Sequence, residues 1–322
     1  MTIKHLILSG GGPLGFRYLS ALETLHDKGF WNLNEIESIY STSIGSIIGV
    51  FFCLKYDWET LNTYLIDRPW HESLKLNTKN LFESYYNKGI FDKKVFELIF
   101  KPLLEAKDLT LSITLQELYE YSNVDLHIFS FELNEFKTYE MSHTTHPNLS
   151  LIDAINRSSS LPGLFVPTFE DNKCFIDGGI LSNTPITECL RDHPEENECL
   201  AIMSSYTDKN DLFANLTINE ESSLLDYVAC ILTNSMNYIR ETGGNKKIKN
   251  LIKCKINYNP LTINVMLNCI SNKETRKEVF NEGIDDANIF LQTIQQNTTP
   301  NNTTPNNTTI ENINVNFDNV NS

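Results

Sequence analysis

A serine follows an apolar segment of the sequence in a position where it could act as a nucleophile. Residues 41–45 read STSIG, which has the spacing of the G-x-S-x-G elbow, with Ser41 in place of the first glycine and Gly45 as the second. In such an elbow a strained turn from strand to helix exposes the hydroxyl of the central serine, here Ser43. A serine just before a helix is also a common N-cap. The motif alone therefore leaves both interpretations open.

An aspartate ends a later apolar segment. Asp177 follows KCFI and precedes Gly178 and Gly179. A carboxylate at the end of a strand can be held rigidly at the carboxyl edge of a sheet, which is where open α/β folds place their sites. Asp-Gly is also among the commonest turn dipeptides, so a plain turn is the alternative interpretation.

A run of glycines follows the first apolar segment. Residues 10–15 read GGGPLG and connect the segment HLIL to a segment with helical spacing. Backbone N–H groups of Gly10, Gly11 and Gly12 could converge there on an anion at the N-terminus of a helix. The run is not a Walker A motif, because GK[ST] is absent, and no ribose-binding acid follows it at the spacing of a dinucleotide site. A tight turn between strand and helix is the alternative.

The elements that would position these motifs alternate along the chain. Apolar segments predict strands, and segments with apolar residues three and four apart predict helices. In chain order these are a strand at 5–8, a helix at 16–30, a strand at 36–40 and a helix at 43–56. Alternation of this kind predicts a parallel sheet covered by helices on both faces.

The remainder of the chain continues this mixture. Strands are expected at 124–133 and 137–141, where an antiparallel hairpin is feasible, and again at 174–177 and 199–205, whereas residues 222–295 have a mainly helical pattern. The segment VFELIFKPLLEA is amphipathic and could dock on a membrane, although packing into the core is the favoured interpretation.

Composition favours a globular protein. The chain has 322 residues, of which 41% are hydrophobic, so it can build a substantial core. Its formal net charge is −15. This charge argues against nucleic-acid binding, which needs concentrated Lys and Arg, and it predicts long-range repulsion from anionic membranes.

The cysteines and the apolar segments indicate a cytoplasmic protein. The seven cysteines are widely spaced and form no CxxC motif, so reduced thiols are expected rather than disulfides or a structural zinc site. The first residues, MTIKHLILSGG, contain too short an apolar run for a signal peptide. The apolar run at 47–54 is far shorter than the roughly 20 residues that a membrane span requires.

Taken together and in this order, the three motifs resemble those of the patatin-like phospholipase family. The resemblance covers residues 3–206 and includes the glycine loop, the serine elbow, SSSLPGLFVP at 158–167 and DGGILSNTP at 177–185. It implies a three-layer α/β/α patatin-like fold with a mostly parallel central sheet. It also implies a lipid acyl hydrolase that needs neither a cofactor nor a metal ion.

The resemblance also assigns roles to residues. Ser43 would attack an ester carbonyl and form an acyl-enzyme, and Asp177 would take the serine proton directly as general base. Backbone N–H groups would stabilise the oxyanion, and the family pattern gives this role to Gly10, Gly11 and Gly12. The residues that would support these groups are Gly15, Ser41, Gly45, Gly178 and Gly179. The implied substrates are glycerolipids, either phospholipids or acylglycerols, met in transient contact with a membrane or lipid interface.

Two departures from the family pattern bear on the substrate and on the elbow. Ser41 replaces the first glycine of the elbow. Leu14 stands where many members of the family carry Arg or Lys. Leucine at this position is similar to the lipid-droplet, adiponutrin-type branch of the family, and it leaves neutral glycerolipids open as substrates.

Two alternatives remain open. Ser43, Asp177 and His193 occur in the chain order of Ser-Asp-His hydrolases, although the segment RDHPEEN around His193 is typical of an exposed polar loop. The other alternative is a non-catalytic protein that binds lipid or a partner on the same fold.

The chain is expected to have three regions. Residues 1–206 would form the patatin-like catalytic core, and residues 207–295 would form a mainly helical part packed on that core. Residues 296–322 repeat Asn, Thr and Pro and lack the apolar content of a core, so a disordered tail is expected there.

Overall fold

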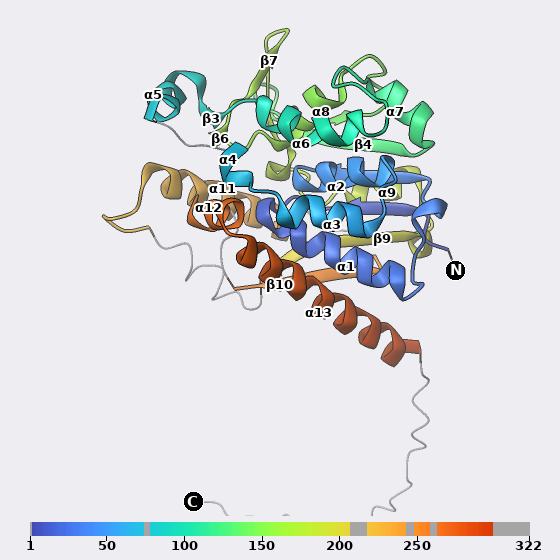
Figure 1. The fold of residues 1–322 in the computed structure, drawn as a ribbon. Coiled ribbons are helices and arrows are strands. Elements are labelled where there is room, and N and C mark those ends of the chain that lie inside the picture. Colours follow the sequence, from blue (N-terminus) through green and yellow to red (C-terminus); the bar gives the residue numbers. More distant parts are fainter. Residues whose placement is uncertain (1, 74–77, 207–217, 243–247, 258–262, 299–322) are drawn as a thin grey trace, which may run out of the picture.

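The computed structural model describes residues 2–73, 78–206, 218–242, 248–257 and 263–298. A sheet lies at its centre (Figure 1). Within these residues the main sheet has eight strands. They are β1 (His5–Leu8), β2 (Ser38–Thr42), β4 (Asp125–Glu132), β5 (Lys137–Met141), β7 (Thr168–Glu170), β8 (Lys173–Asp177), β9 (Cys199–Tyr206) and β10 (Leu251–Ile256). Their order is β10-β9-β1-β2-β4-β8-β7, with β5 paired to β4.

The sheet is mostly parallel, as expected. β10, β9, β1, β2 and β4 pair in parallel, whereas β5 and β8 pair with β4 antiparallel and β7 pairs with β8 antiparallel. The predicted hairpin is therefore confirmed as β4 and β5. Every residue of β1 and β2 is buried. Strands that are apolar on both faces need cover on both sides, which the helices provide.

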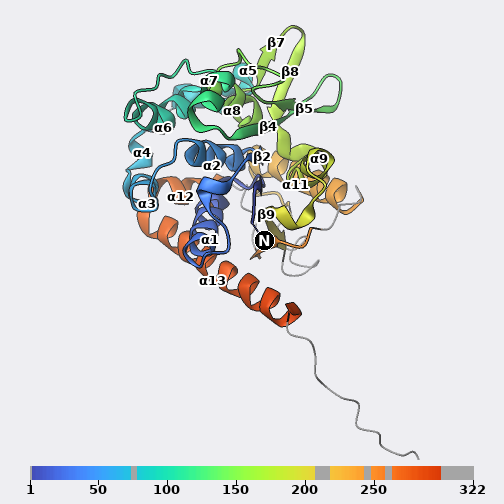
Figure 2. The same cartoon turned by 90° about the vertical axis from the view of Figure 1, so that its right-hand side faces the viewer.

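The side chains of β1 show how the two faces are covered. Leu6 and Leu8 belong to a large apolar cluster with α1 (Gly15–Asp27), α2 (Ile44–Cys53) and α13 (Lys273–Thr298). Ile7 belongs to a second cluster with α9 (Ile186–Asp192). Successive side chains of a strand point to opposite faces, so the clusters lie on either side of the sheet. Figure 2 shows the resulting three layers, with α1 and α2 on one side and α9 on the other.

The other elements of the described residues are further α-helices and a second sheet of two strands. They are α3 (Trp58–Asp67), α4 (Trp70–Ser73), α5 (Thr78–Asn87), α6 (Lys94–Glu105), α7 (Leu115–Ser122), α8 (Leu151–Ser159), α11 (Leu224–Thr242) and α12 (Ile263–Ser271), with β3 (Gly89–Phe91) paired to β6 (Gly163–Phe165). α6 is the amphipathic segment of the sequence, and it buries Phe96, Phe100 and Leu104 in the large cluster, so the favoured core-packing interpretation is confirmed. Among the described residues, no helix has both the length and the apolar character to cross a membrane.

The region after residue 206 contains a strand that the sequence pattern did not predict. β10 joins the sheet in parallel with β9, although residues 222–295 were expected to be mainly helical. Its Ile252, Cys254 and Ile256 are buried and alternate with exposed Lys253 and Lys255, which is the pattern of a strand covered on one face.

α13 lies along α1 and binds it through a buried ion pair. A Cβ at Gly283 would come within 2.1 Å of the Arg17 carbonyl oxygen, so only glycine allows this approach. Arg17, to which the sequence gave no role, donates from Nε and Nη2 to the Asp286 carboxylate and from Nη1 to Glu282. α13 continues to Thr298, so residues 296–298 of the expected tail are helical, and residues 299–322 lie outside the described residues.

Candidate active site

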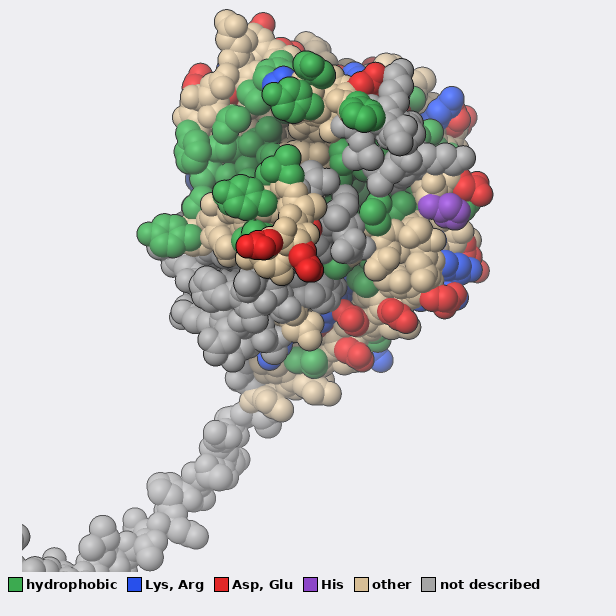
Figure 3. Space-filling model, turned by 90° about the vertical axis from the view of Figure 1, so that its left-hand side faces the viewer, with side chains coloured by type: hydrophobic (Ala, Val, Ile, Leu, Met, Phe, Trp, Pro, Cys, Tyr) green, Lys and Arg blue, Asp and Glu red, His purple; other side chains and the backbone are tan. Residues whose placement is uncertain are grey.

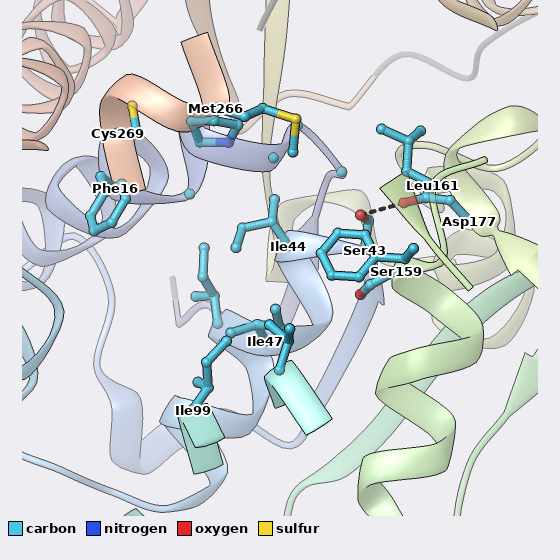
Figure 4. Close-up of a pocket in the computed structure, with 18 of the residues that line it drawn as sticks. Phe16, Ser43, Ile44, Ile47, Ile99, Ser159, Leu161, Asp177, Met266 and Cys269 are labelled. Carbon is cyan, nitrogen blue, oxygen red and sulfur yellow. Dashed lines mark hydrogen bonds between the residues drawn. The ribbon is translucent and has the colours of Figure 1, made fainter. Parts of the chain in front are cut away.

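Ser43 occupies a sharp turn between β2 and α2. Its backbone has φ 54° and ψ −123°, a region that residues other than glycine rarely adopt. Its side chain makes no capping hydrogen bond to α2. Instead, Ser43 Oγ donates a hydrogen bond of 2.6 Å to Asp177 Oδ2, as Figure 4 shows. The N-cap interpretation is therefore wrong, and the strain belongs to a turn that presents the hydroxyl to a carboxylate.

Small residues around the elbow allow this turn. A Cβ at Gly45 would lie 2.2 Å from the Leu8 carbonyl oxygen, and a backbone atom of β1 cannot move away. Ser41 fits in place of glycine because its buried side chain has a partner, and Ser41 Oγ donates to the His127 carbonyl of β4 at 3.0 Å. The departure from G-x-S-x-G thus leaves the geometry of the elbow intact.

Ser158 fixes the backbone of the elbow, which the sequence pattern did not reveal. The N–H of Ser43 donates to Ser158 Oγ at 2.9 Å, and Ser158 Oγ donates in turn to the Phe129 carbonyl of β4 at 2.6 Å. Ser158 is fully buried near the end of α8. The triple serine of SSSLPGLFVP was the available signal, but the sequence does not show which of its three hydroxyls reaches residue 43.

Asp177 ends β8 and is held at the carboxyl edge of the sheet. Its Oδ1 accepts a hydrogen bond of 2.8 Å from the N–H of Gly179, and its Oδ2 accepts the bond from Ser43. A Cβ at Gly178 would lie 2.3 Å from the Phe129 carbonyl oxygen, so the turn after β8 requires glycine. Burial raises the pKa of the Asp177 carboxyl to about 6, although the hydrogen bonds from Ser43 and Gly179 oppose this.

The glycine loop lies beside the elbow, and the segment after Asp177 holds it. The N–H of Gly10 donates to the Asn183 carbonyl at 3.0 Å, so Gly10 has no free N–H for an oxyanion and this part of the expectation is wrong. Asn183 also donates from Nδ2 to Ser9 Oγ at 2.9 Å. Within the described chain, no group accepts a hydrogen bond from the N–H of Gly11 or Gly12. These two donors are available at the N-terminal side of α1.

Gly15 brings the loop and the elbow together. A Cβ at Gly15 would lie 2.3 Å from Ile44 Cγ1, the first residue of α2. The close contact of α1 with α2 therefore depends on this glycine. Gly12 adopts φ 52°, a left-handed conformation that suits glycine, in the short 3₁₀ turn Gly12–Leu14 that leads into α1.

A cavity of about 250 Å³ opens beside Ser43 and Asp177. Its walls are mainly apolar side chains of α1, α2, α6, α11 and α12, among them Phe16, Ile47 and Met266 in Figure 4. Of the described residues, no Lys or Arg lines it. Ser159 contributes a hydroxyl that is buried in the wall and has no hydrogen-bond partner among the described residues. The cavity can hold an apolar chain with one end at the Ser43 hydroxyl.

His193 lies away from this site. Its ring stacks on His5 with 3.7 Å between the ring centroids, and His5 begins β1. Ser43 follows the other end of β2, which runs parallel to β1, so the two residues are at opposite edges of the sheet. The structure therefore does not bring Ser43, Asp177 and His193 together as a triad. No cluster of three or more potential metal ligands occurs among the residues described.

Comparisons with known proteins give the relatives of this chain. Residues 6–190 match the family model described as patatin-like phospholipase. The chain is 28% identical over 200 residues to the probable lipid hydrolase 463L of Invertebrate iridescent virus 6, which covers 61% of this chain and 66% of that protein, just under two thirds. It is 26% identical over 259 residues to the uncharacterized protein R571 of Acanthamoeba polyphaga mimivirus, with 79% and 84% covered.

A solved structure shares the fold. VipD from Legionella pneumophila superposes with a TM-score of 0.53 and 17% sequence identity, covering 91% of this chain and 67% of the VipD chain. At this low sequence identity, the superposition supports a shared fold and nothing about function. Since the family model spans more than half of the chain and the superposition gives the same fold, the chain belongs to the patatin-like phospholipase family.

Proposed function

We propose that the protein hydrolyses fatty-acyl ester bonds of glycerolipids, with Ser43 as nucleophile and Asp177 as general base. The observation that carries this proposal is the hydrogen bond of 2.6 Å between Ser43 Oγ and Asp177 Oδ2 at the end of an apolar cavity. The family supports a lipid ester hydrolase, and so does the likeness to a viral protein named as a probable lipid hydrolase.

The reaction would proceed in two halves. Ser43 Oγ attacks the carbonyl carbon of the ester while its proton passes to Asp177 Oδ2, and the oxyanion forms near the N–H groups of Gly11 and Gly12. The tetrahedral intermediate collapses when the alcohol leaves with the proton from Asp177, which gives the acyl-enzyme. Water then attacks the acyl-enzyme, Asp177 accepts a proton of that water and returns it to Ser43, and the fatty acid is released.

A direct dyad needs an aspartate that is a better base than usual. A free aspartate, with a pKa of about 3.9, is a weak base for a serine hydroxyl. Burial raises the pKa of Asp177 to about 6, which is closer to neutral pH than the usual value. The carboxyl group still remains mostly ionised at pH 7. The two free backbone donors of the glycine loop would supply the rest of the stabilisation, at a few kcal/mol per donor.

The lining of the cavity favours a substrate that is uncharged near the ester. The wall is mainly apolar and, among the described residues, lacks Lys and Arg. A phosphate group close to the scissile bond would therefore lose its hydration without gaining a partner. Neutral acylglycerols fit this site better than phospholipids cleaved beside the phosphate.

The experiment compares the wild type with Ser43→Ala and Asp177→Asn on p-nitrophenyl butyrate and on monoolein, with His193→Ala as the matched control. Both active-site variants should lose at least about a thousandfold in kcat/KM, whereas His193→Ala should retain it. Circular dichroism checks that each variant is folded. A fluorophosphonate ester should also label the wild type at Ser43, which mass spectrometry of the peptides detects.

The same experiment can overturn the proposal. An inactive wild type that binds oleate and is not labelled would favour the non-catalytic lipid-binding protein. A large loss of activity in folded His193→Ala would favour a Ser-Asp-His mechanism and a rearrangement of the sheet edge.

A further inference from the structure

α5 exposes aromatic side chains that a globular protein ordinarily buries. Phe82, Tyr85 and Tyr86 are 78% to 82% exposed and lie within two turns of this helix. Close by, Lys88 Nζ lies 5.4 Å from the centre of the Phe169 ring of β7, which is itself exposed. Contiguous exposed apolar groups of this size mark surfaces that contact a partner.

α11 carries a second set of exposed apolar side chains. Leu224, Tyr227 and Ile231 are 48% to 76% exposed and are spaced three and four residues apart, which aligns them on one stripe of the helix. Figure 3 shows hydrophobic side chains gathered in the upper part of the face that presents α5 and α11. We name these six side chains the aromatic face: Phe82, Tyr85, Tyr86, Leu224, Tyr227 and Ile231.

The aromatic face adjoins the cavity through the same elements. Thr233 and Met236 line the cavity from α11 and follow Ile231 by two and five residues, which at about 100° per residue places them on the opposite side of that helix from Ile231. α5 leads through Lys88 directly into β3, and β3 pairs with β6, whose Phe165 lines the cavity. The same helix, α11, therefore carries part of the exposed face on one side and part of the cavity wall on the other.

The charges near the aromatic face favour an uncharged or zwitterionic surface as its partner. Of the charged side chains that the structure describes there, Glu83 of α5 and Asp226 of α11 are acidic, and Lys88, which directly follows α5, is basic. The whole chain carries a net charge of −15. An anionic membrane would repel such a protein, whereas tyrosine and phenylalanine insert readily into the interface of neutral lipids.

We propose that the aromatic face docks on zwitterionic lipid layers and brings the helices that wall the cavity close to them. This inference rests on the proposed function, because it takes the cavity as the binding site of a lipid. α6, the amphipathic helix that the sequence offered for this role, packs into the core instead. Docking by the face on α5 and α11 buries apolar area that water otherwise solvates, and that area supplies the affinity.

The test measures flotation of the full chain with phosphatidylcholine vesicles. It uses the Ser43→Ala background, so that binding is read without turnover. The first variant is Phe82→Ser/Tyr85→Ser/Tyr86→Ser and the second is Tyr227→Ser/Ile231→Ser. The matched control is Ile284→Ser/Ile289→Ser, two exposed isoleucines on α13.

Both face variants should reduce vesicle partitioning by about tenfold or more, and the control should leave it unchanged. In proteins that keep Ser43, the same face variants should lose hydrolysis of vesicle lipid but retain turnover of soluble p-nitrophenyl butyrate. If the proteins that keep Ser43 show no hydrolysis, but flotation with vesicles still depends on the aromatic face, the proposed function is refuted and the docking proposal is supported.

Three results would overturn the docking proposal. The first is a wild type that does not float with vesicles, and the second is face variants that float as well as the wild type. The third is a dimer in analytical ultracentrifugation that the face variants dissociate, because the face would then be an interface between two copies. Stronger flotation with vesicles that contain phosphatidylserine would overturn the choice of a zwitterionic surface.

Discussion

The titration of Asp177 gives the sharpest prediction from the site. Only the ionised carboxylate can accept the proton of Ser43, so kcat/KM should follow the ionised fraction of this group. Burial raises the pKa of Asp177 to about 6, against the hydrogen bonds from Ser43 and Gly179 that lower it. Activity should therefore rise as the pH increases through 6 and level off above 7.

The size of this change separates a buried aspartate from an ordinary one. With a pKa of about 6, the ionised fraction is about 0.09 at pH 5 and about 0.9 at pH 7, so kcat/KM should rise about tenfold between them. An aspartate with the usual pKa of about 3.9 would already be more than about 90% ionised at pH 5. In that case the same interval would change kcat/KM by less than about 1.2-fold.

The assay follows kcat/KM for p-nitrophenyl butyrate from pH 4.5 to 8, with the product read at a wavelength where its acid and base forms absorb equally. Ser43→Ala gives the background hydrolysis at each pH, and far-ultraviolet circular dichroism shows that the protein stays folded. A flat profile down to pH 5 in folded protein would refute the reasoning from burial. A limb near pH 6.5 that disappears in His193→Ala would assign the titration to histidine instead.

The same raised pKa predicts an opposite effect on stability. The folded pKa of about 6 lies above the usual value of 3.8, so the native state binds this proton more tightly than the unfolded chain does. The resulting contribution to stability is fully present below pH 3.8 and is lost as the pH rises through 6. Asp177→Asn should therefore raise the free energy of unfolding at pH 7, by at most about 3 kcal/mol, as urea titration measures.

Three further predictions follow from contacts outside the dyad. Although burial lowers it, two carboxylate partners raise the pKa of His127 to about 9. The stability that His127 contributes should be full below pH 6.5 and should be lost as the pH rises through 9. Urea titrations of the wild type and His127→Gln at pH 6 and pH 9.5 measure this contribution, which should differ by about 3 kcal/mol between the two pH values. Asp286→Ala should cost about 3 kcal/mol in thermal or urea unfolding because it removes the main partner of buried Arg17, whereas the exposed neighbour Asp285→Ala should cost less than about 0.5 kcal/mol. Asn183→Ala should loosen the glycine loop and lower kcat for p-nitrophenyl butyrate about tenfold while KM changes little, since in the proposed mechanism the N–H groups of this loop stabilise the oxyanion.

Features that depend on the backbone near the motif were predictable from the sequence. The elbow needs a small residue at position 45 because the carbonyl of Leu8 lies next to it, and the glycine at this position already indicates that need in the sequence. Asp177 is predictable in the same way, because the two glycines that follow it indicate a tight turn at the end of the strand. The alternation of strands and helices likewise gave the layered fold, because each apolar segment must be covered on both faces.

Features that depend on distant partners were not predictable in this way. Gly10 belongs to the expected glycine loop, yet its N–H is taken by Asn183, 173 residues later. Ser158 reaches Ser43 only because α8 passes beside β4. The burial of Arg17 on α1 likewise depends on its partner Asp286, which lies on the distant helix α13.

β10 is a different kind of omission, because its sequence does carry a signal. LIKCKI alternates apolar and charged residues with period two, which is typical of a strand at the edge of a sheet. The segment is short and lies between long helical patterns, and a window of helical length averages this alternation away. Its two lysines suit the position, since an edge strand with charged side chains resists pairing with another chain.

Part of the cavity wall lies outside the segment that the family model matches. Residues 6–190 contain Ser43, Asp177 and the glycine loop, whereas Met236, Met266 and Ile270 of the wall come later in the chain. Arg276 fixes α12 by donating to the carbonyls of Cys269 and Ile270 and, across the molecule, to those of Ile66 and Arg68. The matched core thus holds the proposed catalytic residues and most of the cavity wall, and α11 and α12 complete that wall. Substitutions in α11 and α12 should therefore change the preference for the acyl chain while leaving the proposed nucleophile and base in place.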